Sequence, residues 1–85
     1  MAAYSVFFKE SVQKDLADIP KKDLTKILTR VKSLAANPRP AGSEKLTGQY
    51  RYRLRQGRYR IVYAVQDQER TVTVVKVGHR KDVYR

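Results

Sequence analysis

Hydrophobic residues at the start of the chain follow the spacing of a strand. Within residues 3–8, Tyr4, Val6 and Phe8 occupy alternate positions. Side chains two apart on a strand share a face, so this pattern predicts a strand with at least one buried side.

The spacing then becomes helical over two consecutive segments. Val12, Leu16 and Ile19 are four and three apart, which predicts a short helix that Pro20 closes. Proline is tolerated in a first turn, so Pro20 can also open the next helix. That second helix is predicted to end at Asn37–Pro38, because a residue before proline avoids the α region. Its apolar stripe consists of Leu24, Ile27, Leu28, Val31, Leu34 and Ala35.

The second half of the chain has the pattern of three strands. Tyrosine and leucine alternate with arginine up to a turn at Gln56–Gly57, residues 58–65 form the next strand, and residues 71–77 the last. Gly78 is expected to interrupt this last strand. The order strand–helix–helix–three-strand predicts an α+β fold, an antiparallel twisted sheet with two helices packed on one face.

Composition narrows the class of protein. The 85 residues fit a single domain, residues 1–85, and the absence of cysteine excludes disulfides and thiolate metal sites. Lys and Arg outnumber Asp and Glu by 19 to 8, and this charge of +11 favours a polyanionic partner. We expect a cytoplasmic protein, because no apolar run approaches the roughly 20 residues of a membrane span and the N-terminus lacks a signal-peptide pattern.

Positive charge is concentrated on one predicted hairpin. Five arginines and no acid lie between Arg51 and Arg60. Arg51, Arg53 and Arg55 alternate with apolar residues and must therefore project from one face of their strand. The helices need apolar contacts, so we expect them to cover the opposite face and leave the arginine face open. One interpretation is that these arginines are simply solvated. However, guanidinium groups in this arrangement repel one another unless anions lie between them. The planar guanidinium can also bind two phosphate oxygens at once.

The chain lacks the residue patterns of several common chemistries. It has no Walker A loop, its single histidine cannot build a His-rich metal site, and the acids Asp15, Asp18 and Asp23 are interpreted as surface charges on the helices. We therefore expect no metal and no cofactor. RNA carries its own nucleophile, the 2′-hydroxyl, and arginines can neutralise the phosphate charge. A tyrosine near arginines, or His79, could then accept the proton.

Two segments resemble the RelE/ParE superfamily of bacterial toxins. They are K-L-T-G-Q-Y-R-Y-R-L-R-Q-G-R-Y-R-I-V-Y from Lys45 and V-G-H-R-K-D-V-Y-R from Val77. The similarity extends over nearly the whole chain. The RelE branch implies a toxin of a type II toxin–antitoxin system, an endonuclease that cuts messenger RNA in the ribosomal A site and leaves 2′,3′-cyclic phosphate and 5′-hydroxyl ends.

The resemblance also implies roles for single residues. Arg60 matches the arginine that stabilises the transition state, and Arg80 matches one that contacts the phosphate or the leaving group. Tyr84 matches the tyrosine that stacks on or activates the reacting nucleotide.

The match departs from the family at Arg51 and Arg53, where some members have lysines. A lysine there can act as a base more easily than an arginine. We therefore keep Arg53 in the catalytic set but expect the proton to go to Tyr84, with His79 as the second candidate. The residues expected to hold RNA are Lys45, Arg51, Arg53, Arg55 and Arg58.

Two other functions stay open. A ParE-like toxin would inhibit DNA gyrase without being an enzyme, and that branch usually lacks the set of Arg60, Arg80 and Tyr84. A basic binding module without toxicity is the third interpretation. For a toxin, the family implies a cognate acidic, RelB-like antitoxin that wraps the protein, in a bacterial or archaeal cytoplasm; the RelE branch adds the 70S ribosome and messenger RNA as partners.

Overall fold

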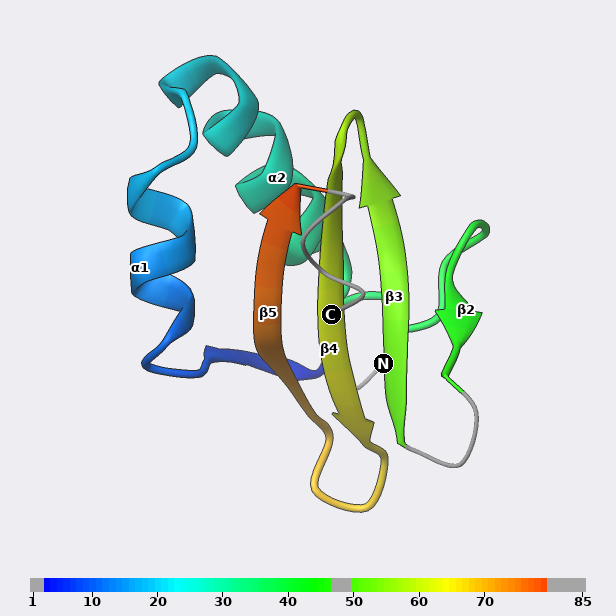
Figure 1. Cartoon of the computed structure of the whole chain (residues 1–85). Coiled ribbons are helices and arrows are strands. Elements are labelled where there is room, and N and C mark those ends of the chain that lie inside the picture. The colour runs from blue at the N-terminus through cyan, green and yellow to red at the C-terminus, as the bar shows by residue number, and fades with distance from the viewer. Residues whose placement is uncertain (1–2, 47–49, 80–85) are drawn as a thin grey trace.

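The chain folds into a strand, two helices and four further strands (Figure 1). The computed structural model describes residues 3–46 and 50–79. This order confirms the predicted α+β class. The elements are β1 Ser5–Phe8, α1 Val12–Ala17, α2 Lys21–Ser33, β2 Glu44–Lys45, β3 Arg51–Gln56, β4 Tyr59–Gln66 and β5 Thr71–His79.

All described strands belong to one sheet of order β1-β5-β4-β3-β2. β3, β4 and β5 form the predicted antiparallel meander. Two features differ from the prediction. β1 pairs with β5 in parallel, since the chain returns to the sheet through the two helices, and a short β2 pairs antiparallel with the outer edge of β3.

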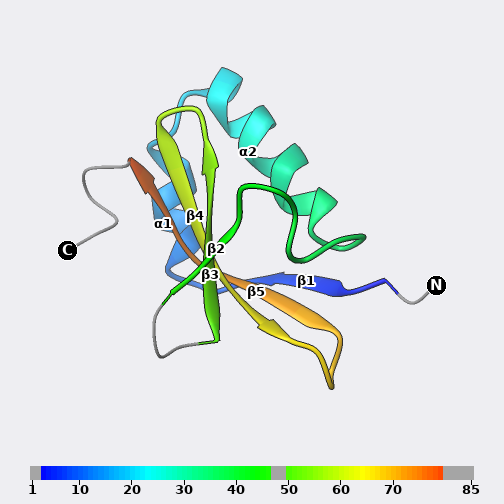
Figure 2. The same ribbon diagram turned by 90° about the vertical axis from the view of Figure 1, so that its right-hand side faces the viewer.

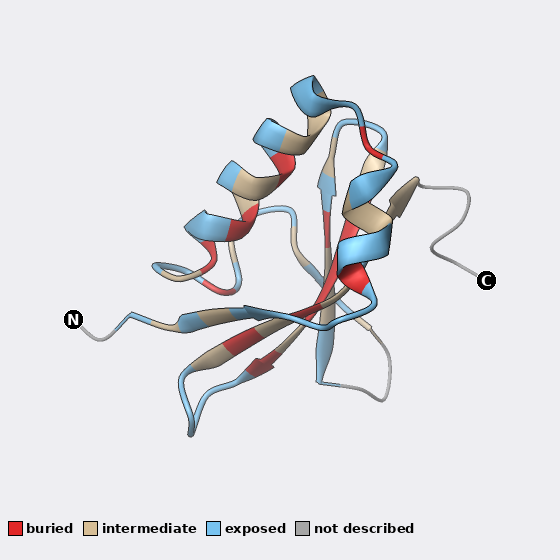
Figure 3. Cartoon of the chain, turned by 90° about the vertical axis from the view of Figure 1, so that its left-hand side faces the viewer, coloured by how far each residue is buried: buried red, intermediate tan, exposed pale blue. Residues whose placement is uncertain are grey.

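The core lies between one face of the sheet and the helices. Strand register places Leu54, Ile61 and Val77 side by side, and each is almost wholly enclosed. Figure 3 shows the buried residues along the middle of the sheet and on the inner sides of the helices. The helices and the residues directly after them contribute the apolar residues Val12, Ile19, Ile27, Val31 and Leu34. No helix in the described ranges is long and apolar enough to cross a membrane.

Asp15 corrects one prediction. Its side chain was interpreted as a surface charge, yet it accepts hydrogen bonds from Lys76 Nζ at 3.1 Å and from the Val77 backbone N–H at 3.2 Å. The pairing of β5 with β1 ends at Val74, so the following part of β5 is an edge among the described strands. Asp15 therefore attaches α1 to a strand edge whose N–H would otherwise lack a partner.

Gly78 corrects another prediction, because β5 continues through it. Gly78 pairs with Arg60 and His79 pairs with Tyr59, so the strand extends to the tip of the β3–β4 hairpin. Glycine weakens a strand without ending it when the neighbouring strand supplies the ladder hydrogen bonds.

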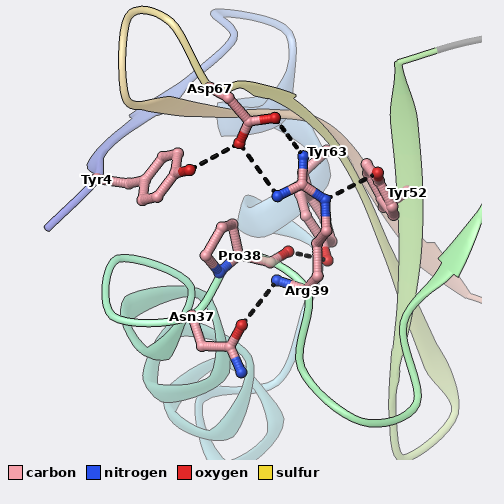
Figure 4. Close-up of polar contacts among 7 residues, drawn as sticks. All are labelled: Tyr4, Asn37, Pro38, Arg39, Tyr52, Tyr63 and Asp67. Carbon is pink, nitrogen blue, oxygen red and sulfur yellow. Dashed lines mark hydrogen bonds and ion pairs between the residues drawn. The ribbon is translucent and has the colours of Figure 1, made fainter.

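A polar network fixes the segment that joins α2 to β2 (Figure 4). Arg39 donates from both terminal nitrogens to the Asp67 carboxylate, at 2.7 and 3.1 Å, and from Nε to the Tyr52 hydroxyl at 2.9 Å. The Tyr4 hydroxyl donates to the same carboxylate at 2.7 Å. Figure 2 shows the segment beside the C-terminal end of α2. The network thus ties this segment to β1, to β3 and to the turn after β4.

Asp67 should make stability depend on pH. The hydrogen bonds from Arg39 and Tyr4 lower the pKa of this carboxyl. Its contribution is present above the unfolded pKa of about 3.9 and is lost as the pH falls through the lower folded pKa. Asp67→Asn should therefore be less stable than the parent at neutral pH, and urea titrations should show this difference shrinking as the pH falls below about 4. A difference independent of pH would contradict this role.

Tyr63 joins the same segment to the core. Its side chain is fully enclosed, it stacks on Tyr52, and its hydroxyl donates to the Pro38 carbonyl at 2.8 Å. Tyr63→Phe should lower the free energy of unfolding by about 1–2 kcal/mol, because a buried carbonyl loses its donor. Tyr50→Phe is the matched control. Tyr50 is 80% exposed, so removal of its hydroxyl should hardly change the free energy of unfolding. Equal stability of both variants in denaturant titrations would refute this assignment.

Candidate functional site

The arginines of β3 project from one face, as predicted. Their partners across the strand are Ala64 for Arg51, Val62 for Arg53 and Arg60 for Arg55. The residues between them, Tyr52 and Leu54, pair with Tyr63 and Ile61 on the core side. The two-residue period of the strands therefore separates a cationic face from a core face.

The cationic face is only partly open. Arg51 and Arg55 are exposed, whereas Arg60 is 4% exposed. Of the three arginines predicted on an uncovered face, Arg51 and Arg55 are thus open, Arg53 is only partly exposed, and Arg60 on the neighbouring strand is buried. β4 is an inner strand, so Arg60 has β3 on one side and β5 on the other.

Arg55 and Arg60 form a cross-strand pair of like charges. Directly opposed like charges destabilise a sheet, so this pair favours folding less than almost any neutral pair would. An anion between the two guanidinium groups would remove that repulsion. The arrangement is therefore suited to a ligand that carries negative charge.

A cleft of ≈ 350 Å³ lies where these arginines converge. β2 pairs with β3 only at Tyr52 and Arg53, which leaves β3 from Leu54 onwards as an edge within the described residues. Lining residues come from α2, from the segment before β3, and from the β3–β4 hairpin. They are Arg30, Gly42, Glu44, Arg53, Leu54, Arg55 and Arg60.

Arg30 was not among the site residues predicted from the sequence. It lines the cleft from α2, and its Nε is enclosed without a hydrogen-bond acceptor among the described residues. Arg30 follows Ile27 by three positions and precedes Leu34 by four, so it borders the buried stripe of α2. This spacing was the available signal that its side chain turns towards the sheet.

Glu44 is the acidic residue among those that line this cleft. Its Oε2 lies 3.0 Å from Nη2 of Arg53, and the two form an ion pair. This hydrogen bond and the Arg53 charge lower the pKa of Glu44, and the charges of Arg55 and Arg60 act in the same direction. Three arginines therefore act electrostatically on one carboxylate.

Other predicted site residues are not brought to this cleft. Lys45 pairs with Tyr52, which places it on the core side of the strand pair, and Arg58 is exposed in the β3–β4 turn. His79 pairs with Tyr59 and makes an edge-on ring contact with it at 6.0 Å between centroids. The register therefore places His79 on the opposite face from Arg60. Arg80 and Tyr84 lie outside the described residues.

A larger cavity of ≈ 930 Å³ is less suited to an anion. It adjoins the far end of the β3–β4 pair and the following turn. Arg51 is one of its lining residues, but so are the carboxylates of Asp67 and Glu69. The smaller cleft, with four arginines and one carboxylate, is the better candidate for phosphate.

Comparison with known proteins identifies the family. Residues 6–84 match the family model described as ParE toxin of type II toxin-antitoxin system, parDE. The chain belongs to the RelE/ParE toxin superfamily. Toxin RelG from Mycobacterium tuberculosis is 30% identical over 96% of this chain and 97% of its own length. This confirms the family suggested by the sequence motifs.

Solved RelE structures share the fold of this toxin. One is the toxin–antitoxin complex RelBE2 from Mycobacterium tuberculosis, with a TM-score of 0.81 and 26% identity over 92% of this chain and 99% of that chain. Another is the isolated E. coli RelE toxin, with a TM-score of 0.79 and 28% identity over 96% and 92% of the two chains. The relatives named here carry the names RelG, RelBE2 and RelE, whereas the matching family model carries the ParE name.

Proposed function

We propose that this toxin is a metal-independent endoribonuclease that cleaves messenger RNA in the ribosomal A site. The observation that carries the proposal is the convergence of Arg30, Arg53, Arg55 and Arg60 on one cleft in a chain of this superfamily. Several guanidinium groups around one cavity provide bidentate donors for phosphate oxygens. The names of its relatives, RelG, RelE1 and RelE, favour this branch.

The proposed reaction uses the nucleophile of the substrate. The 2′-oxygen attacks the adjacent phosphorus, the bond from phosphorus to the 5′-oxygen breaks, and a 2′,3′-cyclic phosphate and a 5′-hydroxyl result. One proton leaves the 2′-hydroxyl and one reaches the 5′-oxygen. Arg60 and Arg53 would neutralise the charge that grows on the non-bridging oxygens, which is the step that fixed cations accelerate most.

The proton acceptor is proposed to be Tyr84. Nearby arginines would lower the pKa of a tyrosine and make its phenolate more accessible. His79 is the weaker candidate, because its strand position places it on the face opposite Arg60. Arg80 would contact the phosphate or the leaving oxygen.

A cognate antitoxin is the proposed protein partner. The RelBE2 relative was solved as a toxin–antitoxin complex. The +11 charge of this chain suits a partner with an acidic segment, which could cover the arginines of β3 and so block access of RNA.

The name of the matching family model favours a second function, inhibition of DNA gyrase by a ParE-like toxin. The two functions differ in their first effect on cells. Pulse labelling after tightly controlled expression should show an early stop in protein synthesis with cut messages for an endonuclease. A gyrase inhibitor would induce the DNA-damage response while translation continues.

The decisive experiment uses the purified toxin with ribosomes carrying a defined message. We expect cuts at the A-site codon, with 2′,3′-cyclic phosphate on the upstream fragment. Fragments with 3′-hydroxyl ends, or an uncut message, would overturn the proposed reaction. Naked message in parallel tests whether the ribosome is required.

A further inference from the structure

Glu44 lines the arginine cleft and forms an ion pair with one of its arginines, Arg53. β2 pairs Glu44 with Arg53, so both side chains project from the same face. The carboxylate lies 3.0 Å from a terminal nitrogen of Arg53. A carboxylate and a phosphate present the same kind of oxygen to a guanidinium fork, and therefore compete for the same donors.

The two partners of this ion pair differ in exposure. The Glu44 side chain is 59% exposed, whereas that of Arg53 is 25% exposed. Arg53 is therefore the more constrained partner and Glu44 the one with room to move. Glutamate also has several rotamers available at an exposed position, so its carboxylate can leave the arginines without movement of β3.

The surroundings make the carboxylate more than an ordinary surface ion pair. An exposed pair of this kind usually contributes little to stability. Here the hydrogen bond from Arg53 and its charge lower the pKa of Glu44, and the charges of Arg55 and Arg60 act in the same direction, so several arginines act on one carboxylate. Among the described residues that line this cleft, Glu44 supplies the negative charge that acts on the opposed Arg55 and Arg60.

We propose that Glu44 is a built-in counter-anion of the arginine cleft, which a phosphate of the bound polynucleotide must displace from Arg53. Glu44 then has two effects. It reduces repulsion among the arginines in the free protein, and it lowers the affinity of the cleft for polyanions. It is a positioning and affinity-determining residue, not a catalytic one. The identity of the polynucleotide as RNA rests on the function proposed above.

The test is binding of a labelled single-stranded DNA oligonucleotide, which lacks a 2′-hydroxyl and so cannot be cut by the proposed reaction. Glu44→Gln keeps the shape of the side chain and removes its charge. The variant should bind about tenfold more tightly at low salt, since a negative charge close to the phosphate is removed. The gain should shrink as salt rises.

A matched control separates a local effect from a change of net charge. Glu69→Gln removes the same charge from an exposed residue of the turn between β4 and β5, outside the arginine cleft. It should change affinity by less than about twofold. Equal gains for Glu44→Gln and Glu69→Gln, or no gain for Glu44→Gln, would overturn the proposal. Thermal unfolding of each variant checks that the fold is intact.

Failure of this inference is distinguishable from failure of the proposed function. If the toxin cuts message on ribosomes but Glu44→Gln binds DNA no better, the counter-anion role is wrong and the endonuclease stands. If Glu44→Gln binds more tightly but no message is cut, the cleft still binds polyanions and the endonuclease assignment is wrong. Inorganic phosphate as a competitor, with the oligonucleotide at trace concentration, shows whether the gain belongs to a phosphate site, because the inhibition constant of phosphate should be lower for Glu44→Gln than for the parent.

Discussion

Arg60→Ala should lower the rate of message cleavage on programmed ribosomes by about 10²–10³-fold, the loss typical of removing one donor that stabilises transition-state charge. Arg60 is held between two strands, opposite Arg55 and Gly78, and is 4% exposed. A guanidinium in such a position needs little reorganisation when charge develops on the phosphate. Single-turnover cleavage measures the effect on the chemical step, and relief of growth arrest measures it in cells.

Two further variants keep this prediction testable. Arg60→Lys retains the charge but not the planar guanidinium, so its cleavage rate should lie between those of the parent and Arg60→Ala. Arg58→Ala removes a guanidinium from the exposed hairpin turn and should lower the cleavage rate by no more than a few-fold. Because Arg60 is buried, thermal unfolding must show that each protein is folded. A folded Arg60→Ala protein that cleaves at the parent rate would remove Arg60 from the mechanism.

The local part of this architecture could be predicted from the sequence. Side chains alternate between the two faces of a strand. Arg51, Arg53 and Arg55 therefore share one face in any fold that makes this segment a strand. The observed turn, Gly57–Arg58, lies one residue later than the predicted Gln56–Gly57, and this register brings Arg60 opposite Arg55, because a tight turn determines which residues pair. Helix spacing likewise identified the buried residues of α2.

Features that depend on distant parts of the chain could not be predicted. β2 has two residues, too few for a periodic pattern, yet it carries Glu44 to Arg53. Arg39 and Asp67 are joined although they are 28 positions apart. The parallel pairing of β1 and the burial of Arg60 likewise follow from the order of strands, which alternation alone does not determine.

Charge and burial together suggest why the arginine cleft is built as it is. Arg55 opposite Arg60 costs stability, and Glu44 offsets part of that cost in the free protein. Replacing these arginines with neutral residues would make a more stable sheet and a poorer phosphate site. Such conflicts between stability and ligand binding are common at functional sites.

Binding of single-stranded RNA should depend steeply on salt. Four phosphates contacted by the arginines of β3 and its neighbours would give a log–log slope of about −3, since each contact releases roughly 0.7 of a counterion from a single strand. Affinity should therefore fall about 50-fold between 50 and 200 mM salt. Filter binding to an RNA whose 2′-hydroxyls are methylated measures this without cleavage.

Single substitutions test which charges produce the slope. Arg55→Ala should make the slope shallower by about 0.7, because one phosphate contact is lost. Lys14→Ala removes one exposed positive charge from α1, which packs on β5, and should leave the slope unchanged because Lys14 does not line the arginine cleft. A flat salt response of the parent, or equal changes in both variants, would mean that net charge alone attracts the RNA. The arginine cleft would then lose its role as the phosphate site. Phosphate contacts at defined positions make the salt slope depend on which cation is removed, whereas attraction by net charge does not.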